Sequence, residues 1–507
     1  MNLLSDSFKW IPVIYQGRFR HISLKNLLCK DEDWQISLNR DDMELAALQL
    51  VICLVQVVFV PHDGKELKRR METPLTEEEY KKGIVAFPDM FVLDHPKHPF
   101  MQTRGVEGKE VSLQKFFIGL PEKASTSPYA HAFFNEVDEV EKACPSCSAI
   151  ALFQQATNGV SLGGSPFPVG LKGMSPVTTL VFYQNLRKRI WGNILSKEFL
   201  SKKKLYSAKP ADNKPTWKSP IRLNGKKAEA AHKIGLIRGL FWQPSRVELR
   251  KSTGNDVVCD SCGVKATAYF TGFCQEPSPY KREGFWRHPH SPVDVVQKSY
   301  FKFWSQVPTW ANLSQFFWEK KSSDEGHSPA LVITQHNEIW PGKPISISIG
   351  GYVSSKEKVE ARRHEIYSLP AGWENNMVNI ENLILTAIKT KDILWATLFD
   401  LGTMKGPSDI PPLFTKPKRK NKPHPSMSLP NAGTELFLQL IEPEVHGILR
   451  NIHWKEAESV RTSFKATLTT IANESFNHAV EPHQHNIRAV PKIVLKRKEL
   501  KTVLNSL

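Results

Sequence analysis

Apolar runs long enough to cross a membrane are missing from this 507-residue sequence. The best stretch, Met43–Val60, is interrupted by Glu44, Gln49 and Gln56, whereas a membrane-spanning helix needs about 20 mostly apolar residues. Two charged side chains already occur within the first ten residues, a pattern that predicts no signal peptide. We therefore expect a protein without a membrane partner that stays in the cytoplasm.

Cysteine is scarce: the chain has seven, an odd number. Without an export signal we expect a reducing compartment, where paired cysteines hold metal more often than they form disulfides. Two Cys-x-x-Cys units, Cys144–Cys147 and Cys259–Cys262, are separated by 111 residues, and four thiolates complete a tetrahedral zinc site. Gly263 follows the second unit, where the turn commonly needs a positive φ. A shared structural zinc is favoured; redox pairs and independent buried thiols are the alternatives. Three further cysteines are interpreted as small core residues: Cys29, Cys53 and Cys274.

Motifs of common catalytic sites are also absent. The sequence has no Walker A motif, no Gly-x-Gly-x-x-Gly and no Gly-x-Ser-x-Gly, and no set of residues supplies a nucleophile, a base and an orienting group together. Histidine pairs invite a metal-enzyme interpretation, but none lies at helical spacing beside a carboxylate. Nearby prolines favour turns and structural roles for His95 and His98, His288 and His290, and His483 and His485. The residues therefore predict no enzyme and no catalytic residue. The alternative is a metal-dependent nuclease, which would need clustered Asp, Glu and His.

Positive charge is in excess and unevenly distributed. Against 68 basic residues stand 51 acidic ones, a net charge of +17. Residues 187–227 hold thirteen cations and two anions, residues 416–422 hold five cations, and a third cluster lies between Lys492 and Lys501. Clusters of this kind attract phosphates without reading sequence, although solvated loops also carry them. No basic stretch has a clear amphipathic face, which disfavours docking on acidic lipid. We expect a polyanion partner, with non-specific DNA contacts at Lys202, Lys203 and Lys204.

The pattern of apolar residues divides the chain into a mixed part and a helical part. Strand and helix signals alternate early, while residues 93–176 are rich in loop-forming residues. In the first part we predict a hairpin over 8–24, a helix over 43–59, and strands over 235–241, 266–273 and 345–349. In the second we predict helices over 377–401, 432–451, 455–478 and 490–504. The expected fold is α+β, with a large mixed domain over 1–369 followed by a four-helix bundle over 370–507.

Several strings of residues are distinctive enough to compare with known families. They are Asn2-Leu-Leu4, Trp10-Ile-Pro12, Arg40-Asp-Asp-Met-Glu-Leu-Ala-Ala47, His98-Pro-Phe-Met-Gln-Thr103, Pro176-Val-Thr-Thr179, Arg238-Gly-Leu-Phe-Trp-Gln-Pro244, Pro289-His-Ser-Pro292, Gly350-Gly-Tyr352 and Arg362-Arg-His364. In this order they resemble the CasA family, the large subunit of the type I-E CRISPR surveillance complex called Cascade. The resemblance runs to about residue 373. Beyond that point it rests on the helical layout and on Phe476-Asn-His-Ala-Val480.

The resemblance implies an antiviral defence protein of the prokaryotic cytoplasm that is not an enzyme. CasA-like subunits check the protospacer-adjacent motif on double-stranded DNA, help start strand separation and assist recruitment of a helicase-nuclease. The implied partners are the other Cascade subunits, the CRISPR guide RNA, the target duplex and that helicase-nuclease. Guide pairing reads the sequence, and protein reads only the short adjacent motif. A zinc-stabilised scaffold without nucleic-acid contacts is a second alternative.

Individual residues can be matched to the family's functional elements. The loop that reaches the guide-RNA end carries Phe and Asn, which match Phe133 and Asn135; stacking plus an amide suits single-stranded RNA. The glycine loop along the minor groove matches Gly163 and Gly164, with one residue inserted nearby. Glycine lets backbone approach a ligand closely. The two Cys-x-x-Cys units align with the family's cysteine pairs, which strengthens the expectation of one zinc at Cys144, Cys147, Cys259 and Cys262.

The chain departs from the family at the remaining positions. The glutamine of the family's hairpin wedge is replaced by Lys356, and its neighbouring asparagine by Ser355. The minor-groove lysine aligns with Pro277, which cannot replace it, so we expect Lys281 or Arg282 to do so. The minor groove presents a degenerate pattern of hydrogen-bonding groups, and these changes therefore predict a loose choice of adjacent motif.

Overall fold

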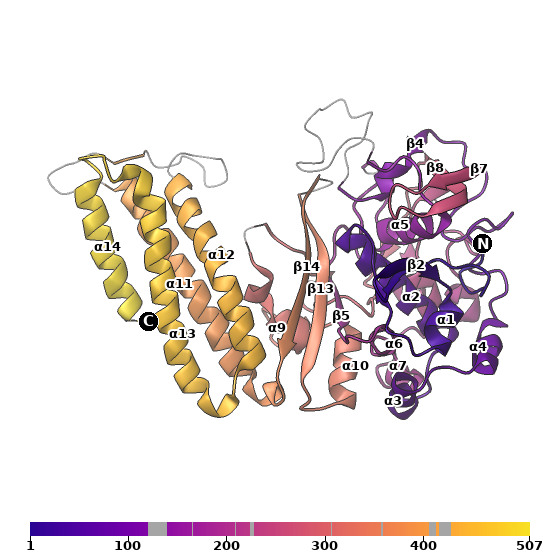
Figure 1. Ribbon diagram of the computed structural model, residues 1–507, viewed down its shortest axis with the longest axis horizontal. Coiled ribbons are helices and arrows are strands. Elements are labelled where there is room, and N and C mark those ends of the chain that lie inside the picture. Colours follow the sequence, from indigo (N-terminus) through magenta and orange to yellow (C-terminus); the bar gives the residue numbers. More distant parts are fainter. Residues whose placement is uncertain are drawn as a thin grey trace. The chain divides into compact units, whose positions relative to one another are not determined.

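The computed structural model (Figure 1) describes residues 1–119, 139–164, 166–207, 209–223, 228–305, 307–355, 358–404, 412–414 and 427–506. The chain forms two compact units. The first comprises Met1–Gln306, Gln315–Pro341 and Ser346–Ile366, and the second comprises Val307–Ser314, Gly342–Ile345 and Tyr367–Leu507. Helices and strands mix in the first unit and four long helices dominate the second, so the predicted α+β class is confirmed.

Within the described ranges, the strands group into five small sheets. Their bounds are β1 Ile11–Tyr15, β2 Arg18–Ile22, β3 Gln35–Ile36, β4 Glu110–Ser112, β5 Thr178–Val181, β6 Glu229–Ala230, β7 Arg246–Val258, β8 Lys265–Glu276, β9 Arg282–Glu283, β10 Val293–Asp294, β11 Ser299–Tyr300, β12 His327–Ser328, β13 Ile345–Ser355 and β14 Lys358–Leu369. The strand orders are β2-β1-β3, β11-β10-β12, β14-β13-β5, β4-β8-β7 and β6-β9. β7 with β8 and β13 with β14 form the two longest hairpins, and the latter pair stands out in Figure 1.

Ten helices precede the C-terminal bundle in the described residues. They are α1 Leu24–Cys29, α2 Asp41–Val58, α3 Gly64–Glu72, α4 Glu77–Ile84, α5 Pro145–Asn158, α6 Leu186–Trp191, α7 Lys197–Lys202, α8 Leu236–Leu240, α9 Ser314–Phe317 and α10 Leu331–Ile339. In α2, fifteen of eighteen residues are buried, so it is apolar on every face and forms the centre of the first unit. The hairpin predicted over residues 8–24 is confirmed as β1 and β2, whose register pairs Ile11 with Ile22.

Two predictions about local structure were wrong or incomplete. Residues 235–241 form α8 and not a strand, because Asn213 Oδ1 accepts hydrogen bonds from the Ile237 amide (2.8 Å) and the Arg238 amide (3.5 Å) at the start of the helix. A short apolar run cannot be assigned to strand or helix by periodicity alone. The stretch predicted as mostly loop contains α5, whose residues after Pro145 are all buried and therefore lack a polar stripe.

The C-terminal helices are α11 Met377–Thr403, α12 Ser428–Asn451, α13 Ala457–Val480 and α14 Val490–Asn505. All four predicted helices are confirmed, and α11 packs against each of the other three. Buried side chains recur at helical spacing, as in Leu394, Leu398 and Leu401 of α11. No helix in the described part of the chain combines the length and the apolar character that crossing a bilayer requires.

Candidate metal centre and nucleic-acid interface

Four cysteines from two distant segments meet in the first unit. Cys144 caps the N-terminus of α5 and Cys147 lies in its first turn, while Cys259 and Cys262 follow β7. All four sulfurs lie within 4.8 Å of one another, and Cys144 Sγ is 3.7 Å from Cys262 Sγ. Zinc–sulfur bonds of about 2.3 Å place tetrahedral ligands about 3.8 Å apart, so this donor set fits one zinc ion.

Backbone contacts hold the two cysteine segments together across the long separation in sequence. Ala143 and Phe270 exchange two backbone hydrogen bonds of 3.0 and 2.9 Å. The Asp260 carboxylate accepts from the amides of Glu141 (2.9 Å) and Lys142 (2.7 Å). The turn from Cys259 to Gly263 is closed by a hydrogen bond from the Gly263 amide to the Cys259 carbonyl, and Gly263 has φ 73°. The positive φ that the sequence predicted for Gly263 is therefore confirmed.

The close packing of the four thiols shifts their pKa values in opposite directions. Hydrogen bonds that the Cys147 thiol donates to its neighbours, Cys144 first, together with burial raise the pKa of Cys147 well above its ordinary value. Hydrogen bonds donated by Cys144 and Cys147 lower the pKa of Cys259. Protons are thus shared among the sulfurs, and a metal cation would replace them as the group that binds the thiolates. The cluster can hold a metal such as zinc.

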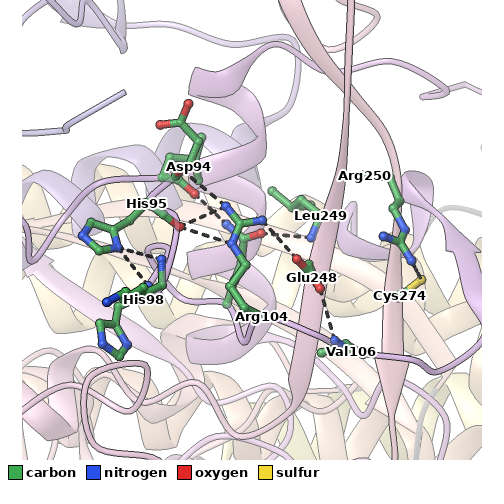
Figure 2. Close-up of polar contacts among 12 residues, drawn as sticks. Asp94, His95, His98, Arg104, Val106, Glu248, Leu249, Arg250 and Cys274 are labelled. Atoms are coloured by element: carbon green, nitrogen blue, oxygen red, sulfur yellow. Dashed lines mark hydrogen bonds and ion pairs between the residues drawn. The ribbon is translucent and has the colours of Figure 1, made fainter.

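The histidine pair at residues 95 and 98 forms hydrogen bonds that stabilise a loop (Figure 2). His95 Nδ1 accepts the backbone amides of the second and third residues after it, and the His95 carbonyl accepts from Arg104 Nε and Nη2. Arg104 also pairs with Glu248 of β7 at 3.0 Å. His98 Nδ1 lies 3.1 Å from the Trp217 carbonyl oxygen. These contacts tie the loop to β7, which supports the structural interpretation.

The second histidine pair lies in the core. His288 and His290 are buried, and the His290 amide donates to His288 Nδ1 at 3.0 Å. Burial lowers the pKa of His290 to about 3 and that of His288 well below its usual value, so both rings are neutral. His483 packs edge-on against Phe414, with ring centroids 6.1 Å apart.

The glycine loop takes a backbone conformation that favours glycine. Gly163 has φ 150° and Gly164 has φ 79°. Ser161 Oγ braces the loop from inside, accepting the Gly163 amide at 3.3 Å and lying 2.9 Å from the Gly164 carbonyl. A Cβ on Gly163 would meet the Phe167 ring at 3.2 Å. The loop therefore presents backbone at its surface at Gly163.

The segment that carries Lys281 and Arg282 runs beside the chain that leaves the glycine loop. The Ser278 amide donates to the Pro166 carbonyl (2.9 Å), and Tyr280 Oη donates to the Val169 carbonyl (3.3 Å). Arg282 donates to the carbonyl of Leu171, so its guanidinium is partly committed to the fold. Lys281 is exposed and has no ion pair among the residues that the structure describes. Of the two predicted substitutes for the family's lysine, Lys281 is the one whose side chain makes no hydrogen bond to the described part of the chain.

A buried polar cluster lies near the tip of the β13–β14 hairpin. Tyr352 donates to Asp42 Oδ2 at 2.7 Å and accepts from Gln154 of α5. Arg40 holds Asp42 with two hydrogen bonds of 3.0 and 2.8 Å, and donates to the carbonyl of Ile118 at 2.6 Å. Burial opposes ionisation of Asp42, but the hydrogen bonds and charge of Arg40 outweigh it and lower the pKa of that carboxyl.

This cluster lies beside three segments: the tip end of the β13–β14 hairpin, the chain at Ile118 and the start of the glycine loop. Tyr352 lies three residues before the end of β13, and Ser355 is the exposed last residue of that strand. Ile118, Tyr352 and Val359 pack together with Val160, which is next to the glycine loop. The other predicted residues of these segments lie outside the described residues: Phe133, Asn135 and Lys356.

The comparison with known proteins decides the family. A family model described as CRISPR-associated protein Cse1 matches residues 2–475. The chain belongs to the Cse1 family. The structure of CasA (Cse1) from Thermus thermophilus resembles it with a TM-score of 0.74 at 17% identity, covering 100% of this chain and 99% of that one. Cse1 from Thermobifida fusca has a TM-score of 0.69 at 13% identity, covering 100% and 97%. A chain described as a CRISPR RNA-guided surveillance complex has a TM-score of 0.65 at 12% identity, and the match covers 100% of this chain and 99% of that one.

The predicted resemblance to the CasA family is thus confirmed, and the matches show that this Cse1 protein shares the fold of those structures. In the basic stretch of residues 187–227, several cations form ion pairs within the chain, which the sequence did not indicate. Arg187 is buried and pairs with Asp31 at 2.9 Å. Lys202 and Lys203 both pair with Glu338, each at 2.9 Å.

Other cations of the stretch keep free charges. Lys204, Lys209 and Lys214 are exposed and form no ion pair within the described part of the chain. Lys209 lines an open pocket of about 450 Å³ together with Arg222. Sequence reasoning did not identify Tyr352 as an anchor, because a tyrosine next to a glycine pair carries no signal of its burial beside Asp42.

Proposed function

We propose that this Cse1 protein is the non-catalytic large subunit of an RNA-guided Cascade complex. In that role it recognises the protospacer-adjacent motif on double-stranded DNA, helps start strand separation and assists recruitment of the helicase-nuclease. Its partners are the other subunits, the guide RNA and the target duplex. Family membership supports this role, and one of the matched structures is described as an RNA-guided surveillance complex. A zinc ion at the four cysteines acts as a structural group that holds α5 against the β7–β8 hairpin.

The observation that carries the proposal is a set of contacts that links the glycine loop with the Lys281 segment and with the tip end of the β13–β14 hairpin. Tyr352 of the hairpin accepts from Gln154 of α5 and packs with Val160 next to the glycine loop, and the Ser278 amide of the Lys281 segment donates to the Pro166 carbonyl just after that loop. A backbone loop with a cation on a neighbouring segment suits the minor groove, where access is narrow and recognition is degenerate. A hairpin tip anchored at the same place is suited to entering the opened duplex.

Substituting Gly164 by alanine tests the glycine loop. At φ 79° a side chain is strained, so the loop shifts and a methyl group separates its backbone from the groove. We expect the assembled complex to bind duplex DNA bearing the adjacent motif about tenfold more weakly, with assembly unchanged. Gly17 supplies the matched control Gly17→Ala, since it has φ 72° in the β1–β2 turn and an added methyl group would meet no atom within 4 Å. Equal binding by both variants would remove the loop from the site.

The free lysines supply a test of the electrostatic contribution. Replacing Lys204, Lys209 and Lys214 by glutamine is expected to flatten the salt dependence of duplex affinity by about 0.9 in slope for each lost phosphate contact. Lys202→Gln with Lys203→Gln is the control, because Glu338 already neutralises these cations in part and the slope should change less. An unaltered slope in the triple variant would assign these charges to solubility.

The alternative of a metal-dependent nuclease makes a different demand on the isolated chain. It would require cleavage of DNA in the presence of Mg²⁺ or Mn²⁺ and loss of that cleavage with a chelator. The scaffold alternative predicts partner binding that ignores salt concentration. The salt titration and a cleavage assay therefore separate the three interpretations.

A further inference from the structure

One tryptophan of this chain is exposed to solvent. All thirteen tryptophans lie in described residues, and twelve of them are buried or half-buried. Trp304 is 69% exposed. An exposed indole forgoes the burial free energy that a large aromatic side chain otherwise supplies, so its position calls for another explanation.

The backbone around Trp304 is held in place rather than loose. Phe303 is buried and forms a parallel bridge with Val353 of β13. The Arg363 guanidinium lies over the Phe303 ring, 5.3 Å from its centroid. The same Arg363 donates Nη2 to the carbonyl of Trp304 at 3.1 Å and to that of Ser305 at 3.3 Å. A cation–π contact and two hydrogen bonds therefore fix the main chain from which the indole projects.

The direction of the bridge places Trp304 toward the tip of the hairpin. Because the two segments run parallel, the residue after Phe303 lies level with Ser354, the residue after Val353. Ser355, the last described residue of β13, is one residue further toward the tip. Trp304 therefore lies beside the tip end of the hairpin, and in the proposed function this end contacts the DNA.

The surroundings of Trp304 have the chemistry of a nucleic-acid contact. Lys302 is exposed and has no ion pair with any described residue. No acidic residue occurs between Ser299 and Ser305. A flat aromatic ring beside unpaired positive charge suits a base and its phosphate, since every base has a face on which an aromatic side chain can stack.

We propose that Trp304 stacks on an unpaired nucleobase beside the β13–β14 hairpin, at the point where the duplex opens. This inference rests on the proposed function. The stacked indole replaces the neighbour that the base loses when the strands part, and so stabilises the opened form. It does not read the adjacent motif, because stacking is tolerant of sequence.

The test uses the assembled complex carrying Trp304→Leu. We expect affinity for matched duplex to fall by about 5- to 150-fold, the range for loss of one aromatic–base stack. A duplex with a few mismatched base pairs beside the adjacent motif offers the same unpaired base without the cost of opening, so it should bind more tightly overall and lose affinity by a similar factor. Trp304→Tyr keeps an aromatic face and should recover most of the affinity. Phe19→Leu, at a 38% exposed aromatic on β2, is the control and should leave binding unchanged.

The outcomes distinguish this inference from the function on which it rests. Equal affinity of Trp304→Leu and the unsubstituted complex, together with weakened binding by Gly164→Ala, would overturn the stacking contact and leave the recognition role in place. If neither variant changes duplex binding, both fall. If Trp304→Leu instead prevents the subunits from assembling, the indole contacts a protein partner and the inference is wrong.

Discussion

Replacing Asp42 by asparagine is expected to destabilise the protein by about 3–5 kcal/mol. The Asp42 side chain is only 7% exposed, and its carboxylate accepts from Arg40, Tyr352 and Arg362. Without the negative charge, the Arg40 guanidinium stays buried and uncompensated, which is the costly way to break a buried pair. Chemical denaturation followed by circular dichroism measures the change.

The residue before it supplies a matched control. Asp41 is also in the first turn of α2, but its side chain is 39% exposed and its ion pair with Arg362 spans 3.5 Å. Asp41→Asn should therefore cost less than about 1 kcal/mol. Tyr352→Phe removes one hydrogen bond to the carboxylate and should fall between the two, at roughly 1.5–3 kcal/mol. Equal stabilities of the Asp41 and Asp42 variants would contradict the anchoring role.

The same group predicts a response to acid. The pKa of Asp42 is lower in the folded chain than in the unfolded one, so its stabilisation is complete above the unfolded value, about 3.9. The stabilisation is then lost as the pH falls through the lower folded value. Unsubstituted protein should lose stability below pH 4 more steeply than Asp42→Asn, in which this titration is absent.

The fold could be predicted where one face of an element is polar. The bundle helices carry buried residues at regular spacing, as in α11, and their positions follow from that spacing. The helix α5 could not be predicted because its residues are buried on all sides, and α8 resembles a strand in sequence because it is only five residues long. In both cases tertiary contacts decide the structure, and no local pattern records them.

In the candidate site, too, local sequence predicts some features, while tertiary contacts decide others. The grouping of the four cysteines and the positive φ of Gly263 follow from residue type and spacing. The pairing of Lys202 with Glu338 does not, since the partners are 136 residues apart and only the folded chain brings them together. Trp304 could not be distinguished from twelve other tryptophans, because exposure is a property of the packed chain.

Loss of the metal is expected to have an effect as large as loss of Asp42. Purified protein should contain about one zinc per chain, and Cys147→Ser should lose it. A bound ligand at a thousand times its dissociation constant contributes about 4 kcal/mol to stability, and a structural zinc at four thiolates should reach at least that value. We therefore expect Cys147→Ser, or treatment with a strong chelator, to lower the unfolding temperature markedly. Elemental analysis and a thermal melt measure the two effects.

Cys29, one of the cysteines outside the cluster, supplies the control for Cys147→Ser. Cys29 is half-buried and burial raises the pKa of its thiol to about 11, so it stays a neutral thiol with no ligand role. Cys29→Ser should keep the zinc and most of the stability. Because Asp260 and Ala143 tie the cysteine segments together through backbone contacts, part of the fold should persist without metal. A fully stable, zinc-free protein with all four cysteines intact would show instead that these hydrogen bonds alone hold α5 to the β7–β8 hairpin.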